Sequence, residues 1–590
     1  MKTAIGNAAR AVLFSALFAF AGSAYGQQAA DSVAPEIATG ISDRQAVRAE
    51  TFMVAAANPH ATRAGHEVLA AGGNAIDAMV AVQLVLGLVE PQSSGIGGGA
   101  FLVYFDGASG RLTTYDGRET APKAATPTLF LDDKGEPLKF FDAVIGGRSV
   151  GTPGTLKLLY ETHRLHGRLD WPSLVQPAID LADNGFEVSD RLFAMLTADS
   201  ERLGLHEETR AHFLGDDGQA HPVGHVLTNH AYAATLRLIA AEGADAFYAG
   251  PIADAIVETV RNGNPGNPGV LALEDLAAYE IKERDPVCVE YRGYDVCGMG
   301  PPSSGALTVG QILGILEPFD MASMSPADPQ TWRLIGDASR LAFTDRGRYM
   351  ADSDFVPMPT RGLLDRAYLN ERARLIEPGT VLTPEQVEPG SPAWDHAQLW
   401  ADDESLELPS TSHFSIVDAD GSVVSMTTTI ENGFGSRLMT NGFLLNNELT
   451  DFSFRTHRDG VPIANRVEPG KRPRSSMSPT IVMRDGRPYL AIGSPGGSRI
   501  IGYVAQAIIA HLDWGLDVQA AINMPHLVNR FGSFDVEKGT EAEKLAAPLE
   551  TLGYKVNIRD LNSGLHAIVI LEDGLQGGAD PRREGTAEGR

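Results

Sequence analysis

The chain has 590 residues, of which 43% are hydrophobic and 21% charged, and its formal net charge at pH 7 is −27. This length and composition are typical of a globular protein and would allow two to four domains. The strong negative charge argues against nucleic acid and anionic membrane surfaces as partners, because both would repel it.

The N-terminus has the pattern of a secretory signal peptide. Lys2 and Arg10 give a positive start, residues 11–21 are apolar, and small residues lead to a cleavage position near Gly26. We therefore expect residues 1–26 to be a signal peptide and the mature protein to be periplasmic or secreted. The stretch is too short to span a bilayer, and the later apolar run 75–89 is interrupted by polar residues and predicts a core helix, so no stable membrane anchor is expected.

Helix and strand patterns then alternate along the first half of the chain. Thr152 followed by Pro153 predicts a helix cap at that position. The expected elements are a helix at 74–89, a strand at 101–105, a helix from Pro153 to Leu165, mostly helical chain at 189–279, and helices at 305–316 and 332–349.

The only two cysteines flank an alternating segment with Arg292-Gly293 at its centre. A two-residue hairpin turn there places Cys288 opposite Cys297 in a non-hydrogen-bonded pair, where side chains approach most closely. We predict a disulfide, which an exported protein permits. Two buried thiols are the alternative, and two cysteines alone do not make a metal site.

The C-terminal third has the alternation of paired strands. Strands are predicted at 413–417 and 422–429, at 480–483 and 489–493, and a helix at 500–512. Two hairpins with packed helices suggest stacked sheets with helices outside. The polar tail 580–590 has the composition of a disordered segment.

Two glycine-containing motifs match known site patterns but lie in the wrong secondary-structure context for them. Residues 147–151 match the Gly-x-Ser-x-Gly nucleophile elbow, but no helix starts directly after the serine. Residues 95–100 match a dinucleotide fingerprint, but they follow a helix and enter a strand, the reverse of what phosphate binding needs. Neither motif predicts a site here.

Three other segments carry the parts of an acyl-transfer site. Residues 409–414 place hydroxyls at the start of a predicted strand, and residues 474–479 place three serines in a predicted turn. Residues 493–498 end a strand and open a helix, where backbone amides point outward and the helix dipole adds positive potential. A nucleophile, helping hydroxyls and amide donors are what acyl transfer requires.

Together and in this order, these segments resemble the γ-glutamyltransferase family of N-terminal-nucleophile hydrolases. The resemblance runs from about Phe52 to Pro581. Further family marks are Gly72-Gly-Asn-Ala-Ile-Asp-Ala78, Asp116-Gly-Arg-Glu119, Ser149-Val-Gly-Thr-Pro-Gly-Thr155, Tyr291-Arg-Gly-Tyr294, Pro301-Pro-Ser-Ser-Gly305, Leu444-Leu-Asn-Asn-Glu448 and Lys471-Arg-Pro473. The resemblance implies an α+β fold, a single αββα sandwich, in place of several domains. It also implies a precursor cut into chains 27–410 and 411–590, which interleave.

The resemblance also implies the catalytic residues. Thr411 becomes the nucleophile when the bond after Ser410 breaks, Thr429 supports it, and Gly496 and Gly497 form the oxyanion hole. The chemistry agrees, because a free α-amino group has a pKa near 8 and can act as the base for its own hydroxyl. No metal or organic cofactor is implied.

The donor pocket is implied in the same way. Arg118 grips the α-carboxylate of the γ-glutamyl group, where a planar bidentate donor suits a planar acceptor. Ser475 and Ser476 assist it, and Glu448 and Asp451 receive the α-ammonium. Glu431 occupies a position where family members have Asn or Glu.

The implied activity is γ-glutamyl transfer from glutathione and related amides to water or to amino-acid and peptide amines. A cephalosporin or glutaryl acylase of the same family is the alternative, and the acid pair Glu448 and Asp451 argues against it. A catalytically inactive binding protein is a third possibility, against which the intact Thr411 and Thr429 argue.

Residues 453–470 correspond to a lid loop that is short and lacks the tyrosine of some relatives.

Overall fold

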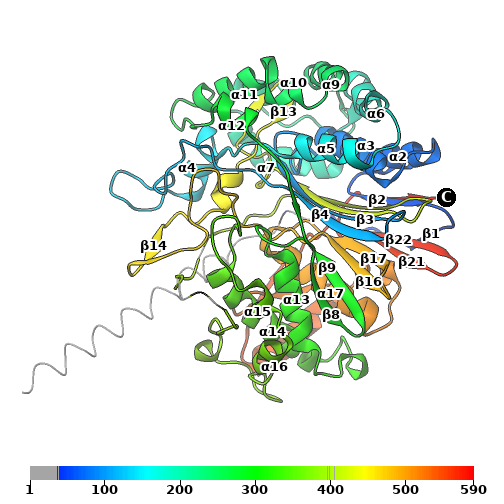
Figure 1. The fold of residues 1–590 in the computed structure, drawn as a ribbon, viewed down its shortest axis with the longest axis vertical. Coiled ribbons are helices and arrows are strands. Elements are labelled where there is room, and N and C mark those ends of the chain that lie inside the picture. The colour runs from blue at the N-terminus through cyan, green and yellow to red at the C-terminus, as the bar shows by residue number, and fades with distance from the viewer. Residues whose placement is uncertain (1–35, 37–38, 395, 397–398, 404) are drawn as a thin grey trace, which may run out of the picture.

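The computed structural model describes residues 36, 39–394, 396, 399–403 and 405–590. These residues form a four-layer sandwich in which two seven-stranded sheets lie face to face and helices cover both outer faces (Figure 1). The αββα architecture predicted from the family resemblance is therefore confirmed. The predicted signal peptide, residues 1–26, lies outside the described residues.

The first sheet carries the two threonines that the family resemblance assigns to catalysis. Its order is β23-β2-β10-β11-β3-β4-β7. The strands are β2 Met53–Ala56, β3 Gly99–Asp106, β4 Arg111–Gly117, β7 Lys282–Arg284, β10 Ser412–Val417, β11 Val423–Thr429 and β23 Thr586–Gly589. Ser412 pairs with Thr428 in the antiparallel hairpin β10–β11. Thr411, just before β10, and Thr429, the last residue of β11, consequently meet at one end of it.

The second sheet has the order β1-β22-β21-β17-β16-β9-β8. Its strands are β1 Val47–Ala49, β8 Val287–Tyr291, β9 Tyr294–Gly298, β16 Thr480–Arg484, β17 Arg487–Gly493, β21 His566–Leu571 and β22 Gly574–Ala579. Both sheets thus combine strands from before and after Ser410, so a cut at that bond would leave two interleaved chains.

Alternation along the strands builds the core. Val54 and Ala56 of β2 pack on the outer helices, whereas Met53 and Ala55 pack between the two sheets. Because successive strand side chains point to opposite faces, each sheet contributes to two apolar layers. Such strands are buried on both sides.

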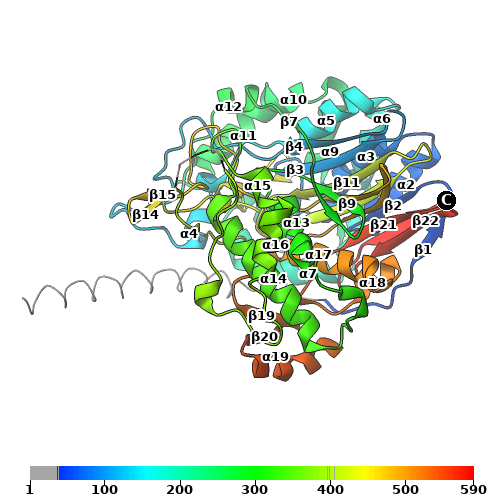
Figure 2. The ribbon, with the colours of Figure 1, turned by 60° about the horizontal axis from the view of Figure 1, so that its bottom comes forward.

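The outer layers consist of helices. One layer contains α2 Pro59–Ala70, α3 Ala75–Val89, α5 Thr155–His166, α6 Trp171–Asn184 and α9 His230–Glu242, and the other contains α13 Gly305–Leu316, α14 Pro329–Tyr349 and α17 Ile500–Leu512 (Figures 1 and 2). The helix pattern of residues 189–279 is confirmed and includes α7 Asp190–Leu203 and α11 Pro251–Asn262. Among the described residues, no helix combines the length and the apolar character that crossing a membrane requires.

Three local predictions were wrong. The helix expected after Thr152 begins at Thr155, and Thr152 forms an isolated bridge with Thr120 instead. A residue before proline favours extended backbone, which explains why Thr152 stays outside the helix. The tail 580–590 is ordered rather than disordered, because it ends in edge strand β23 and buries Arg582 and Arg583 in ion pairs. The Ser475 segment also runs extended beside Ser303 instead of turning.

The hairpin β8–β9 has the register predicted from its turn. Cys288 lies opposite Cys297, with a Cα–Cα distance of 4.1 Å, and a disulfide joins them. Arg292 and Gly293 at the turn both have positive φ, as a two-residue turn of this hand requires. The disulfide links the edge strand β8 of the second sheet to its neighbour β9.

Exported protein should therefore contain no free thiol. Titration of the denatured, non-reduced chain with a thiol reagent is expected to give zero equivalents, and two after reduction. A Cys288→Ser variant, which leaves Cys297 unpaired, should give one and serves as the calibration. Two thiols in unreduced protein recovered from the export compartment would disprove the pairing.

Candidate active site

Thr411 and Thr429 meet at the carbonyl group of Ser410. The chain runs unbroken through residues 410 and 411, and the Thr411 hydroxyl donates a hydrogen bond to the Ser410 carbonyl oxygen. The Thr429 hydroxyl donates to the same oxygen at 2.9 Å and lies 3.3 Å from the Thr411 hydroxyl. The amide of Glu431 donates to the Thr429 oxygen at 2.9 Å, which leaves the Thr429 hydrogen directed at Ser410. The nucleophile candidate thus lies beside the bond that it is predicted to break.

The segment before Thr411 fills the adjacent pocket. Glu407 and Leu408 lie among the predicted donor-binding residues, and the cavity left between them is about 20 Å³. This is about the volume of one water molecule, so no substrate fits while the segment is in place. The described structure is that of the uncut chain.

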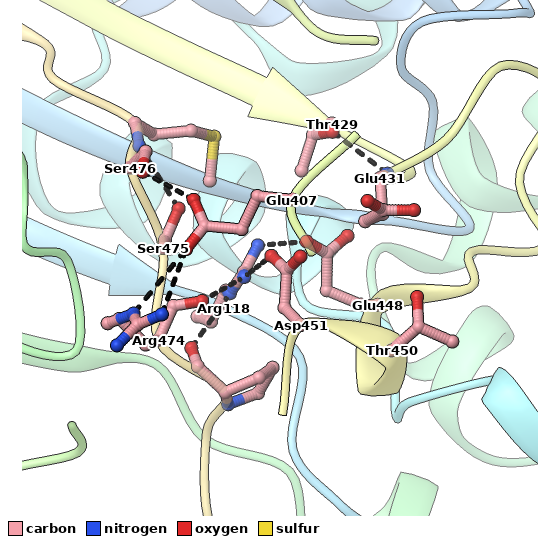
Figure 3. Close-up of polar contacts among 12 residues, drawn as sticks. Arg118, Glu407, Thr429, Glu431, Glu448, Thr450, Asp451, Arg474, Ser475 and Ser476 are labelled. Carbon is pink, nitrogen blue, oxygen red and sulfur yellow. Dashed lines mark hydrogen bonds and ion pairs between the residues drawn. The ribbon is translucent and has the colours of Figure 1, made fainter. Parts of the chain in front are cut away.

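Arg118 lies at the centre of the predicted donor pocket and is 1% exposed. Its guanidinium pairs with Glu448 and, at 2.5 Å, with Asp451, and it donates to the Arg474 carbonyl oxygen at 2.9 Å (Figure 3). Oδ1 of Asp451 is buried and has no hydrogen-bond partner among the described residues. The family resemblance assigns Arg118 to the donor carboxylate and the two acids to the donor ammonium group. In the uncut chain, where no donor is bound, Arg118 and the acids neutralise one another.

Acids outnumber cations in this part of the pocket. Burial raises the pKa values of Glu431, Glu448 and Asp451 well above their ordinary range, although Arg118 acts in the opposite direction. A carboxyl oxygen of Glu431 accepts a hydrogen bond from the Leu408 amide at 3.2 Å. A buried excess of carboxyl groups is a suitable environment for a ligand ammonium group.

Glu119 is a further acid of this cluster that the sequence did not single out. Burial raises its pKa to about 8, with Arg118 lowering it, and its carboxyl group contacts that of Glu448. At neutral pH the Glu119 carboxyl group therefore holds a proton. A Cβ on Gly99 would lie 2.2 Å from Oε2 of Glu119, so the backbone of β3 approaches this carboxyl closely.

The raised pKa of Glu119 predicts a stability that falls as pH rises. The unfolded chain releases this proton near the ordinary value of 4.5 and the folded chain near 8, so the stabilisation is complete below pH 4.5 and is lost towards pH 8. The slope is at most about 1.4 kcal/mol per pH unit for one proton. In an uncut Thr411→Ala background, Glu119→Gln should make the fall in stability less steep by up to this amount in denaturant titrations from pH 5 to 8. The same change at exposed Glu201 is the control. Parallel plots of unfolding free energy against pH with Glu119 and with Gln at this position would refute the raised pKa of Glu119.

The glycine pair lies next to the segment that fills the pocket. Gly497, with φ +59°, lines the cavity together with Thr411. A Cβ at Gly497 would lie 2.9 Å from the Leu408 carbonyl oxygen, so only glycine allows this approach. Gly496, with φ +136°, precedes the 3₁₀ turn that leads into α17 and is not among the residues that line the cavity.

The structure brings most of the predicted site residues together. The cavity is lined by Arg118, Thr411, Thr429, Glu431, Glu448, Asp451, Ser475, Ser476 and Gly497. Besides Glu119, sequence reasoning missed Glu407, Arg346 and Arg474, which interact in this pocket. Figure 3 shows Glu407 and Arg474 of this group. The only sequence signal for Arg474 is its position directly before Ser475.

The predicted lid segment borders a second, larger cavity. Strands β14 His457–Arg458 and β15 Val461–Pro462 form its hairpin. The cavity is about 500 Å³ and is also lined by Phe140, Ser405 and Leu406. Residues 405–408 therefore separate this cavity from the donor pocket.

Comparisons with known proteins identify the family of this chain. The sequence pattern of the γ-glutamyltranspeptidase family matches residues 61–590. The glutathione hydrolase proenzyme of Escherichia coli (strain K12) is 38% identical over 570 residues, which is 94% of each chain. The acylase ACY 1 proenzyme of Pseudomonas sp. (strain SE83) is 34% identical over 563 residues, covering 94% of this chain and 96% of that protein.

A solved structure is similar throughout. The cephalosporin acylase from Bacillus halodurans superposes with a TM-score of 0.80 at 28% identity, covering 94% of this chain and 99% of that one. Proteins named glutathione hydrolase and proteins named acylase are therefore both similar to this chain over nearly its whole length. With the family pattern spanning nearly the whole chain, the protein belongs to the γ-glutamyltranspeptidase family.

Proposed function

We propose that the protein is a self-processing γ-glutamyltransferase that transfers the γ-glutamyl group of glutathione and related amides to water or to amino-acid and peptide amines. The observation that carries this proposal is the buried acid group beside Thr411, in which Glu448 and Asp451 share a single arginine. We propose further that it is exported, that it matures into chains 27–410 and 411–590, and that it needs no cofactor.

Maturation starts from the contact between Thr411 and Ser410. The Thr411 hydroxyl oxygen attacks the Ser410 carbonyl carbon, the C–N bond breaks, and the hydroxyl proton passes to the departing Thr411 nitrogen. Thr429 donates to the carbonyl oxygen as negative charge develops there. Water then hydrolyses the ester, which frees the Ser410 carboxylate and restores the Thr411 hydroxyl beside the new α-amine.

The same hydroxyl then serves the donor. The Thr411 α-amine takes the hydroxyl proton while the oxygen attacks the γ-carbonyl carbon, and the leaving amine receives a proton as its C–N bond breaks. Gly496 and Gly497 amides stabilise the oxyanion in this proposal. Water or an acceptor amine attacks the resulting ester and restores Thr411.

The acid group favours a γ-glutamyl donor over a glutaryl donor. A glutaryl chain has no ammonium group, so it would leave Glu448 and the orphaned oxygen of Asp451 without a partner. An unpaired buried acceptor costs about 1–3 kcal/mol, and more when it is charged. The fold does not distinguish the two candidate activities, because an acylase shares it. The acid group is the feature that favours γ-glutamyl transfer over glutaryl hydrolysis in this protein.

A substrate comparison tests the proposal. The kcat/KM for a γ-glutamyl anilide should exceed that for the matching glutaryl anilide by at least about tenfold on one enzyme preparation. Using one leaving group for both keeps the chemical step comparable. Equal or faster turnover of the glutaryl compound would assign the protein to the acylases and overturn the assignment of the acid pair.

A further inference from the structure

The Glu407 side chain is held in the precursor as a bound carboxylate. Its Oε1 accepts from the Arg346 guanidinium and lies 3.4 Å from both Nε and Nη2 of Arg474. Its Oε2 accepts from the Ser476 hydroxyl, which in turn accepts from Arg346 at 2.7 Å. Burial alone would raise the pKa of Glu407, but Arg346 and Arg474 lower it to about 2, so the carboxylate is charged.

Among the described residues, the side-chain partners of the Arg474 guanidinium lie on the segment just before the scissile bond. They are Asp403 at 3.0 Å, Ser405 at 2.9 Å and Glu407. The guanidinium is 1% exposed, and its Nη1 has no hydrogen-bond partner among the described residues. Arg474 is therefore a buried cation that depends on a removable segment for its neutralisation.

Cleavage after Ser410 makes this segment removable. The segment loses its covalent link to β10 and lies between the donor pocket and the larger cavity of about 500 Å³. A donor can enter only when Glu407 and Leu408 withdraw. Their withdrawal removes the Glu407 carboxylate from Arg346 and Arg474, so that only Asp403 remains paired with Arg474 and another anion can take the place of Glu407.

We infer that Glu407 occupies a carboxylate subsite, formed by Arg346, Arg474 and Ser476, that the α-carboxylate of the γ-glutamyl donor takes after cleavage. This inference rests on the proposed function and adds two cations to the expected role of Arg118. Arg118 lies within reach, because it donates to the backbone oxygen of Arg474. It also explains how one pocket binds both donor charges: the acids Glu448 and Asp451 hold the ammonium group, and the released arginines hold the carboxylate.

The test removes Arg474 and varies the ligand. In fully cleaved Arg474→Gln, kcat/KM for a γ-glutamyl anilide should fall about 10- to 100-fold. The inhibition constant of L-glutamate against this substrate should rise by a similar factor. That of 4-aminobutyrate, which is glutamate without its α-carboxylate, should stay within about threefold of wild type, because a merely distorted pocket would weaken both inhibitors.

Arg474→Lys is the conservative partner, since it keeps the charge and loses the planar fork. The inhibition constant of L-glutamate should rise at least about threefold in Arg474→Lys, which is less than in Arg474→Gln. If Arg474→Gln stays uncut, Arg474→Lys takes its place in the test. An unchanged L-glutamate constant in cleaved protein, or equal rises for both inhibitors, would overturn the subsite. A wild type without γ-glutamyl turnover would instead overturn the proposed function.

Discussion

Thr411→Ala protein is expected to remain a single chain and to lose γ-glutamyl turnover by at least about 10³-fold. The reason is that one hydroxyl serves both reactions in our account. In the precursor it contacts the Ser410 carbonyl, and after cleavage it is the atom that carries the acyl group. A denaturing gel and an anilide assay measure both losses on the same preparation.

Two variants control this result. Thr411→Ser keeps a hydroxyl at the same position and should still cleave, whereas Ser412→Ala removes the neighbouring hydroxyl, which donates to Glu90 at 2.9 Å. Ser412→Ala should cleave and turn over donor normally apart from any change in stability. If Thr411→Ala protein were cut at the same bond, the nucleophile would lie elsewhere.

Arg118→Ala is expected to lower kcat/KM for γ-glutamyl donors by about 10- to 100-fold or more. Each hydrogen bond to a charged group contributes about 1.5–3 kcal/mol, and about 1.4 kcal/mol corresponds to a factor of ten. The loss also leaves Glu448 and Asp451 without their shared cation. Self-cleavage should be largely spared, because no donor group takes part in it.

The measurement is steady-state kinetics on the cleaved fraction, with the extent of cleavage scored on a gel. Arg118→Lys keeps the charge but cannot pair with both acids in the same planar geometry, so it should recover only part of the loss. Normal kcat/KM in cleaved Arg118→Ala would remove Arg118 from donor binding. Loss of cleavage with normal kinetics would assign it to maturation instead.

Much of the fold could be predicted from local patterns. The hairpins β8–β9 and β16–β17 follow from alternation around two-residue turns, and the cysteine register follows by counting outward from Arg292 and Gly293. Core helices such as α3 follow from long apolar runs. These features depend on residues close together in sequence, where turn chemistry and side-chain period determine the structure.

Pairings between distant residues could not be predicted in this way. Arg583 pairs with Glu36 and donates to the Thr411 carbonyl oxygen, and this contact orders a tail whose composition suggested disorder. Glu407 belongs to an acidic run typical of an exposed loop, yet it is buried against Arg346 and Arg474. Composition reports the average surroundings of a segment, whereas these charges are neutralised by partners that only the fold brings near.

The most direct test of the account is to locate the acyl group on the enzyme. Cleaved wild-type protein mixed with a γ-glutamyl anilide and quenched in acid should show, by intact mass, one γ-glutamyl group on the 411–590 chain and none on the other. Peptide mapping should place the ester on the N-terminal Thr411. Rapid donor turnover with the adduct on another residue would contradict the central claim that Thr411 carries the transferred group.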